Sequence, residues 1–201
     1  MAKIRELAYV AFDLEATCHP STKYHEIIEI GAVKLIPNNL EIKEEFETLV
    51  RPSTPIIQPI IKKTGITDKI VEKAPLIHEV WDNFLSFIQN TILVGHQVFL
   101  DLGILNKTAQ RHGLKPINAP AIDTMRLSRR LYPNEPSYGL EHLQKIIALE
   151  VKVHRAKTDA LVTGLLFKYF VEILENKYQI LEFKDLQDFC FNSNPFQTKL
   201  F

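Results

Sequence analysis

The chain has 201 residues, 46% of them hydrophobic and 24% charged, and its 24 Lys and Arg side chains equal its 24 Asp and Glu side chains in number. This suits one globular domain with a core of its own, and the lack of a run of about 18 apolar residues predicts no membrane span. Two cysteines, Cys18 and Cys190, are too few for a disulfide framework or a zinc site, and the first residues lack the features of a secretory signal, so we expect a cytoplasmic protein.

The first fifty residues predict three β-strands in close succession. Residues 9–15 form an apolar and aromatic run up to Asp13, and residues 26–36 and 45–50 are rich in β-forming side chains. The Pro-Asn-Asn sequence at 37–39 predicts a tight turn between the last two strands. Three strands joined by short connections indicate an antiparallel meander.

The apolar period then changes from that of strands to that of helices. From residue 74 to 89 the large apolar side chains fall three or four residues apart, with Pro75 suited to the first turn of a helix. Short apolar runs predict further strands at 91–95 and 121–124. A meander followed by alternating strands and helices predicts an α/β domain with a mixed sheet and helices packed on it. The other helical segments lie at 99–112, where Gly113 ends the helix, and at 124–131, 139–149 and 156–175.

Acidic residues gather at the predicted strand ends and helix starts. Asp13 and Glu15 lie two apart at the end of the first strand, so their side chains point to one face of the sheet. Asp101 opens the helix after the fourth strand, and Asp159 lies in the first turns of the last predicted helix, five residues after His154. Binding sites form at such an edge of open α/β sheets, and converging carboxylates suit Mg²⁺ or Mn²⁺.

Each of these features is common by itself. An Asp-x-Glu pair is expected by chance in about half of all chains of this length. A histidine beside an acidic residue is more often structural, and an Asp at a helix start is usually an N-cap. The 11 Lys and Arg against 6 Asp and Glu in residues 101–170 fit a phosphate-binding face and an ordinary solvated surface equally well. The order of the features along the chain is more specific than any one of them.

Three segments together resemble the motifs of a known enzyme family. FDLEAT (12–17), VGHQVFLD (94–101) and HRAKTDA (154–160) are similar to the three motifs of the DnaQ-like exonucleases, in the DEDDh group of the RNase H-like fold. The resemblance implies a five-stranded mixed sheet flanked by helices. It makes residues 1–175 the exonuclease domain and leaves 176–201 as a Phe-rich extension, which we expect to pack on the domain or on a partner.

The resemblance implies a role for each acidic residue and for the histidine. Asp13 would bridge two Mg²⁺ or Mn²⁺ ions, and Glu15 and Asp159 would hold the ion that activates water. Asp101 would act on the second ion, through water. His154 would be the general base that takes the proton of the attacking water, a task that suits an imidazole near neutral pH.

The activity that the resemblance implies is 3′→5′ hydrolysis of single-stranded DNA or RNA, which releases nucleoside 5′-monophosphates. Two alternatives stay open. One is a proofreading exonuclease subunit docked on a DNA polymerase, and the other is a non-catalytic nucleic-acid-binding protein that keeps the fold. A homo-oligomer is a further assembly that the sequence leaves open.

Four residues are candidate substrate contacts. In the family the segment around the first motif meets the terminal nucleotide, which suggests Leu14, Ala16 and Thr17; Leu14 as a plain core residue is the alternative. His96 is the fourth candidate, although a structural hydrogen bond to the backbone explains it more simply. Three basic side chains either contact phosphates or form a solvated helix face: Arg126, Arg129 and Arg130.

The chain departs from the family pattern in each motif. The first is commonly followed by Thr-Thr-Gly, whereas this chain has Ala-Thr-Cys ending at Cys18, which resembles the RNA-trimming branch of the group. In the second motif the phenylalanine lies one place early, at Phe99, and in the third Lys157 adds a charge near the site. Arg155 stands where the Tyr subgroup carries its tyrosine, so the histidine subgroup fits.

Overall fold

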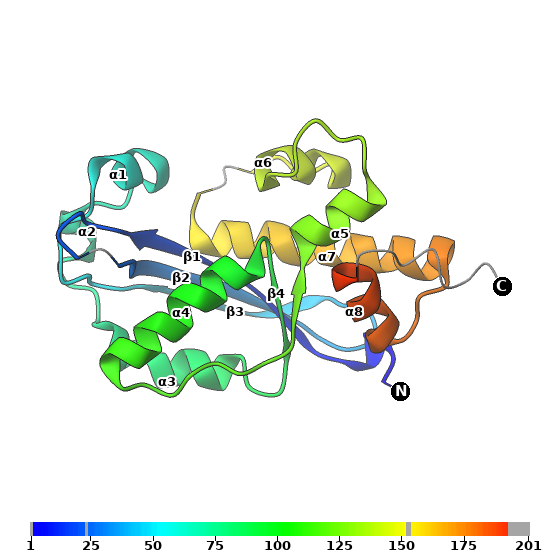
Figure 1. The fold of residues 1–201 in the computed structure, drawn as a ribbon, viewed down its shortest axis with the longest axis horizontal. Helices are drawn as coiled ribbons and strands as arrows, with labels where there is room; N and C mark the ends of the chain where they lie inside the picture. Colours follow the sequence, from blue (N-terminus) through cyan, green and yellow to red (C-terminus); the bar gives the residue numbers. More distant parts are fainter. Residues whose placement is uncertain (1, 23, 152–153, 193–201) are drawn as a thin grey trace.

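The computed structural model describes residues 2–22, 24–151 and 154–192. Its sheet consists of β1 (Tyr9–Thr17), β2 (Glu26–Leu35), β3 (Ile42–Leu49), β4 (Ile92–Gly95) and β5 (Ala121–Asp123). The strand order is β3-β2-β1-β4-β5 (Figure 1). β1, β2 and β3 pair antiparallel, while β4 pairs parallel with both β1 and β5. The expected mixed sheet, a meander followed by parallel strands, is therefore confirmed.

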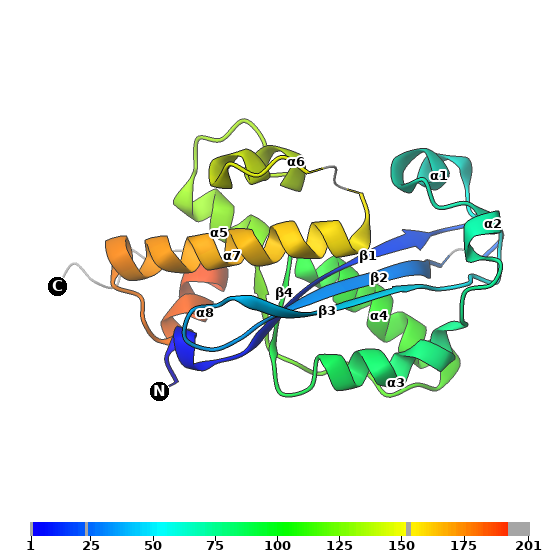
Figure 2. The same cartoon turned by 180° about the vertical axis from the view of Figure 1, so that it is seen from behind.

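Helices cover both faces of this sheet. α3 (Ile77–Phe87) and α4 (Val98–His112) pack on one face, and the long α7 (Ala156–Tyr178) crosses the other, as Figure 2 shows from behind. The shorter elements are α1 (Gln58–Thr64), α2 (Asp68–Val71), α5 (Thr124–Leu131), α6 (Leu140–Leu143), α8 (Phe183–Phe191) and the 3-10 turns η1 (Ile4–Glu6) and η2 (Gln144–Ile147).

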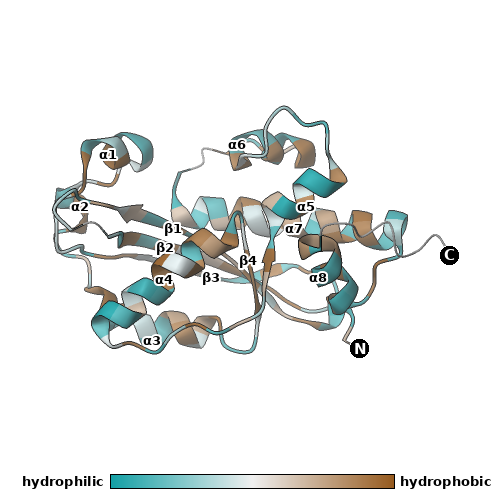
Figure 3. Cartoon of the chain, viewed as in Figure 1, coloured by the Kyte–Doolittle hydropathy of each residue, from teal (hydrophilic) through white to brown (hydrophobic). Residues whose placement is uncertain are grey.

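The side chains of β1 divide between two apolar cores. Val10 and Phe12 pack with side chains of α3 and α4, whereas Ala11 packs with side chains of α7. Successive side chains of a strand point to opposite faces, so Asp13 and Glu15 follow Ala11 onto the α7 face. In Figure 3 the strands and the helices carry both brown and teal, as expected for elements that bury only part of their surface. The pleat of β1 therefore decides which helix meets the two carboxylates.

Two predicted helices differ from the structure. The 74–89 segment is helical only from Ile77, because Leu76 is extended and the carbonyl of Pro75 accepts a hydrogen bond from the backbone N–H of Arg51. The 139–149 segment forms the single turn α6 and then η2, which ends where Ala148 takes a left-handed conformation (φ 51°). The sequence analysis also missed α1 and α2, since neither is long enough to show a helical period.

The C-terminal extension begins inside a helix. α7 continues to Tyr178, so residue 175 does not mark a structural boundary. The following helix, α8, buries Leu186, Phe189 and Cys190 and contacts α5 and β5. The described part of the extension thus packs on the domain, and residues 193–201 lie outside the described residues. None of the described helices is long and apolar enough to span a membrane.

Candidate active site

The candidate site lies where β1 meets the first turn of α7. One ligand atom each of Glu15, His154 and Asp159 lies within 4.8 Å of the other two. The carboxylates of Glu15 and Asp159 are buried, with relative exposures of 3% and 6%. Two buried carboxylates with an imidazole at this separation are able to hold a metal ion.

Asp13 and Asp101 complete an acidic cluster around this group. Burial raises the pKa of Asp13 well above its usual range, and the charges of Asp101, Asp159 and Glu15 raise it further. Burial, and then the charge of Glu15, raises the pKa of Asp101 to about 7. Burial also raises the pKa of Asp159 to about 6. The structure therefore brings the five predicted residues together, and the carboxylates repel one another unless cations neutralise them.

The backbone conformation and hydrogen bonds of His154 fix its position next to Asp159. Its φ is 76°, and its N–H donates to both carboxylate oxygens of Asp159, at 3.1 Å each. A non-glycine residue with positive φ costs about 1–3 kcal/mol, and such strain gathers at functional sites. Arg155, rather than His154, is the N-cap residue of α7, so the imidazole is not used as a helix cap.

Lys63 is a neighbour of the cluster that the sequence analysis did not single out. Its Nζ lies 3.6 Å from Oε2 of Glu15, and its positive charge lowers the pKa values of Asp13, Asp101 and Asp159 against the effect of burial. Lys63 lies on α1, which the apolar pattern did not predict. The sequence therefore gave no indication that Lys63 lies beside Glu15.

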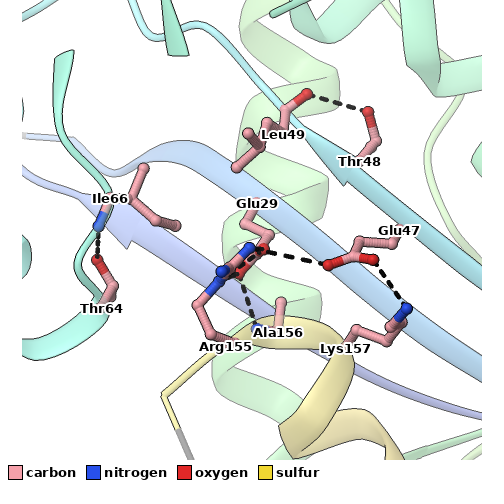
Figure 4. Close-up of polar contacts among 9 residues, drawn as sticks. All are labelled: Glu29, Glu47, Thr48, Leu49, Thr64, Ile66, Arg155, Ala156 and Lys157. Atoms are coloured by element: carbon pink, nitrogen blue, oxygen red, sulfur yellow. Dashed lines mark hydrogen bonds and ion pairs between the residues drawn. The ribbon is translucent and has the colours of Figure 1, made fainter. Parts of the chain in front are cut away.

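An ion pair between buried Glu29 and half-exposed Arg155 fixes the start of α7 on the sheet (Figure 4). Glu29 on β2 is fully buried; it accepts hydrogen bonds from Nε of Arg155 at 3.0 Å and from the backbone N–H of Ala156 at 2.8 Å, and Nη2 of Arg155 also pairs with it. Lys157, the charge that departs from the family pattern, pairs with Glu47 on β3 at 2.9 Å. These contacts position the helix turn that carries Asp159.

Gly31 on β2 allows the first turn of α7 to approach the sheet closely. Gly31 lies directly opposite Asp13 in the β1–β2 ladder. A Cβ at this position would lie 2.1 Å from the backbone carbon of Ala156 and from the backbone nitrogen of Lys157. The first turn of α7 therefore rests on the backbone of β2, beside Asp13.

Replacing Gly31 with alanine is expected to push the start of α7 away from the sheet. Since the clash is with backbone atoms, we expect a loss of about 3 kcal/mol in the free energy of unfolding. Urea denaturation measures this loss, and Gly103→Ala is the matched control because a Cβ there meets nothing within 4 Å. If the two variants were equally stable, this account of the helix–sheet contact would be wrong.

Three of the four candidate substrate contacts have structural roles. Leu14 is 8% exposed and belongs to the core under α3 and α4. Thr17 is fully buried, and its hydroxyl accepts a hydrogen bond from the N–H of Ile57 at 3.3 Å. The Leu14 and Thr17 side chains therefore have little or no surface left for a nucleotide. Ala16 is partly exposed, and its contact with substrate stays a prediction.

Both ring nitrogens of His96 have hydrogen-bond partners within the chain. Nδ1 lies 2.9 Å from the hydroxyl of Thr124, and Nε2 lies 2.7 Å from the carbonyl of Tyr138. Burial lowers the pKa of this histidine. His96 therefore links the start of α4 to α5 and to the loop before α6, and the structure favours the structural reading of this residue.

The three arginines of α5 contact aromatic rings and the end of α8. The guanidinium of Arg126 lies over Phe191, and that of Arg129 lies over Tyr138. Arg130 lies over the ring of Phe189 and donates to the carbonyl of Asn192. These contacts hold the three side chains against the domain, while Arg126 and Arg129 stay exposed, as a solvated helix face requires, and Arg130 is partly buried. A contact of these arginines with phosphates stays a prediction.

Comparison with known sequences identifies the family. The family model RNase_T, described as exonuclease, matches residues 10–167. The chain is 33% identical over 196 residues to the PolC-type DNA polymerase III of Streptococcus sanguinis (strain SK36), a match that covers 97% of this chain and 13% of the polymerase. It is 41% identical over 175 residues to that of Caldanaerobacter subterraneus subsp. tengcongensis, covering 86% of this chain and 12% of the polymerase. The chain thus spans about an eighth of the length of these relatives.

Solved structures share the fold. The nuclease domain of 3′hExo, a DEDDh family member bound to rAMP, has a TM-score of 0.72 at 22% identity and covers 90% of this chain and 98% of that one. Exonuclease X, in complex with 5′-overhanging duplex DNA, has a TM-score of 0.62 at 26% identity, covering 87% and 96%. Given this fold and the match over residues 10–167, the chain belongs to the RNase T exonucleases, the DnaQ-like family with the RNase H-like fold.

Proposed function

We propose that the chain removes nucleotides one at a time from the 3′ end of single-stranded nucleic acid and releases nucleoside 5′-monophosphates. The convergence of four carboxylates and one imidazole at the end of β1 carries this proposal. Two observations support metal-assisted hydrolysis of a phosphodiester. The side-chain donors are hard oxygens, and the raised pKa values of the carboxyl groups indicate a site that bound cations would stabilise.

Each carboxylate has a proposed place in a two-ion site. Asp13, on the strand between the two sides of the cluster, would contact both ions. Glu15 and Asp159 would hold one ion and Asp101 the other, through water. Bound Mg²⁺ or Mn²⁺ would lower the pKa of the attacking water and neutralise the charge that grows on the leaving 3′ oxygen.

His154 is the proposed general base. A ring nitrogen of the neutral imidazole would accept the proton of the attacking water. The hydrogen bonds from its backbone N–H to Asp159 would keep the base beside a carboxylate ligand. The closeness of the ring to Glu15 and Asp159 also makes it a possible ligand, and the difference can be measured through metal affinity.

A proofreading role is the second candidate function. It is favoured by the similarity to PolC-type DNA polymerases over 97% and 86% of the chain. In this role the substrate would be a DNA strand with a mispaired 3′ end, and the partner would be a polymerase. A primer with a 3′ mismatch, shortened faster than a paired primer when the polymerase is present, would support it. A non-catalytic binding protein would have little need for all five groups.

Degradation is expected to require a free 3′ end and to proceed from that end. With Mg²⁺ or Mn²⁺, a 5′-labelled single strand should shorten in single-nucleotide steps, and a strand blocked at its 3′ end should persist. Gel electrophoresis shows the ladder, and chromatography identifies the 5′-monophosphates. DNA and RNA strands run side by side give the sugar preference. Products with 3′-phosphates, or cleavage of a circular strand as the main reaction, would contradict the proposed function.

A further inference from the structure

Glu29 is a carboxylate beside the acidic cluster that is used differently from the four proposed metal ligands. It lies directly opposite Glu15 in the β1–β2 ladder, and its side chain is fully buried. Both of its oxygens are turned to the start of α7, where they accept hydrogen bonds from Arg155 and from the backbone N–H of Ala156 (Figure 4). A carboxylate with these partners has little freedom to reach an ion, although it is next to a proposed ligand.

We propose that Glu29 is a positioning residue, which places His154 and Asp159 for the proposed reaction by clamping the start of α7. The inference rests on the proposed function and goes beyond it, because Glu29 neither holds a metal nor takes a proton in that function. It acts through the two residues that it holds, Arg155 and Ala156, which lie in the chain between the proposed base and the proposed ligand.

The clamp restrains both a side chain and the main chain. Nε of Arg155 lies 3.0 Å from Oε1 and 3.2 Å from Oε2 of Glu29, and Nη2 of the same guanidinium pairs with Oε1. A guanidinium that uses two nitrogens on one carboxylate fixes direction as well as distance. The N–H of Ala156 donates to Oε2 at 2.8 Å, so the backbone of the first helical turn is tied to β2 directly.

His154 and Asp159 take their places relative to the clamped residues. His154 directly precedes Arg155, and its N–H reaches both carboxylate oxygens of Asp159 at 3.1 Å. The N–H of Asp159 in turn donates to the carbonyl of Arg155 at 2.9 Å. The left-handed backbone of His154 persists only where surrounding contacts hold it, and the clamp on the next residue is such a contact.

The ion pair also offsets a further negative charge beside the cluster. Burial raises the pKa values of Glu15 and Asp159, and the charge of Glu29 raises them further. The hydrogen bond with Glu29 raises the pKa of Arg155, so the guanidinium stays protonated and supplies the opposite charge. Replacing Arg155 alone by an apolar side chain would leave a buried, unpaired carboxylate opposite Glu15, which is costly.

Two conservative variants test the geometry of the clamp. Glu29→Gln keeps the size of the side chain but loses the charge that pairs with Arg155, and Arg155→Lys keeps the charge but loses the two-nitrogen contact. We expect each to lower kcat for a ten-nucleotide single strand about 10–100-fold, because displacement of a catalytic group by about 1 Å has an effect of this size. KM should change less than about threefold, because a loss confined to the chemical step leaves binding unchanged.

Glu44→Gln is the matched control for these variants. Glu44 pairs with Lys34 at 3.1 Å between β3 and β2, so the variant removes an ion pair of the same sheet that does not involve α7. It should keep the parent's kcat and KM. Unchanged kcat in both Glu29→Gln and Arg155→Lys would overturn the inference.

A double variant separates positioning from stability. Glu29→Leu leaves the guanidinium without its partner and should lower the melting temperature, whereas Glu29→Leu/Arg155→Leu replaces the pair by apolar side chains and should recover most of that loss. Its kcat should stay about tenfold or more below the parent's, because a leucine cannot accept the N–H of Ala156. A double variant that regained both the melting temperature and the parent's kcat would show that Glu29 only stabilises the domain, and would overturn the inference.

Hydrogen exchange tests the clamp without reference to activity. In the metal-free parent the N–H of His154 is bonded to Asp159 and should exchange slowly. In Glu29→Gln it should exchange about tenfold faster or more, while the amides of β1 keep the parent's rates. A parent that degrades no strand contradicts the proposed function alone, since the exchange rate still reports the clamp. An equal rate for His154 in the parent and in Glu29→Gln contradicts the clamp.

Discussion

Asp13→Asn is expected to lower the rate of strand degradation by about 10³-fold or more, because one side chain is proposed to serve both ions. Asparagine keeps the volume of the aspartate but removes its charge. The affinity for Mn²⁺, measured by isothermal titration calorimetry, should fall with the rate. Asp82→Asn is the control, because Asp82 is exposed on α3 and is not among the charges that shift the pKa values of Asp13 and Asp101.

The same substitution is expected to stabilise the metal-free protein. Folding raises the pKa values of Asp13, Asp101 and Asp159, the latter two to about 7 and about 6. A carboxyl group with a raised pKa contributes stability that is fully present below its unfolded pKa of about 4 and is lost as the pH rises through the folded value. The metal-free parent should therefore lose stability between about pH 4 and pH 7.

At pH 8 the metal-free Asp13→Asn protein should be about 1 kcal/mol more stable than the parent, since it lacks one of the repelling charges. Thermal unfolding with EDTA, and then with Mg²⁺, measures this. Mg²⁺ should raise the melting temperature of the parent more than that of the variant. If Asp13→Asn kept most of its turnover, the role of Asp13 would be wrong. If it were less stable than the parent without metal, the account of repulsion among the carboxylates would be wrong.

The fold was largely readable from the sequence because its signals are local. The apolar run along β1 and the helical spacing along α7 are properties of neighbouring residues, and they predicted a strand and a helix there. The two-residue period of a strand also predicted that Asp13 and Glu15 share one face. The same two-residue period places Leu14 in the core on the opposite face, between the two catalytic candidates. The resemblance to the family pointed to Leu14 and Thr17 as substrate contacts, but a motif specifies the residue type and does not specify which way its side chain points.

The parts of the site that the sequence analysis missed depend on contacts between distant segments. Glu29 and Arg155 are 126 residues apart, and their pairing follows from the register of β2 under the start of α7. Gly31 is needed only because the backbone of α7 lies against it. Lys63 meets Glu15 through a short helix with no apolar period. Composition and spacing carry no information about such packing, whereas the coordinates give it directly.

His154→Ala is expected to lower the rate about 10²–10⁴-fold, the usual contribution of a positioned acid or base. Metal affinity should change little, because the four carboxylates remain. A base must be neutral to accept a proton, so the parent's rate should rise with pH as the imidazole loses its proton, and the variant should lack that rise. His78→Ala, an exposed histidine of α3, is the control and should keep both the rate and the pH profile.

The positive φ of His154 calls for a second variant, since alanine adopts a left-handed conformation less readily than histidine does. Asparagine accepts the left-handed conformation more readily, so His154→Asn keeps the backbone that donates to Asp159 and removes the base. If both variants lose the rate and keep their Mn²⁺ affinity, the loss belongs to proton transfer. If both bind Mn²⁺ much more weakly, the imidazole is a ligand, as its closeness to Glu15 and Asp159 permits. If His154→Asn keeps a near-full rate and the parent's pH profile, then His154 serves only to shape the backbone before α7, and the general base lies elsewhere.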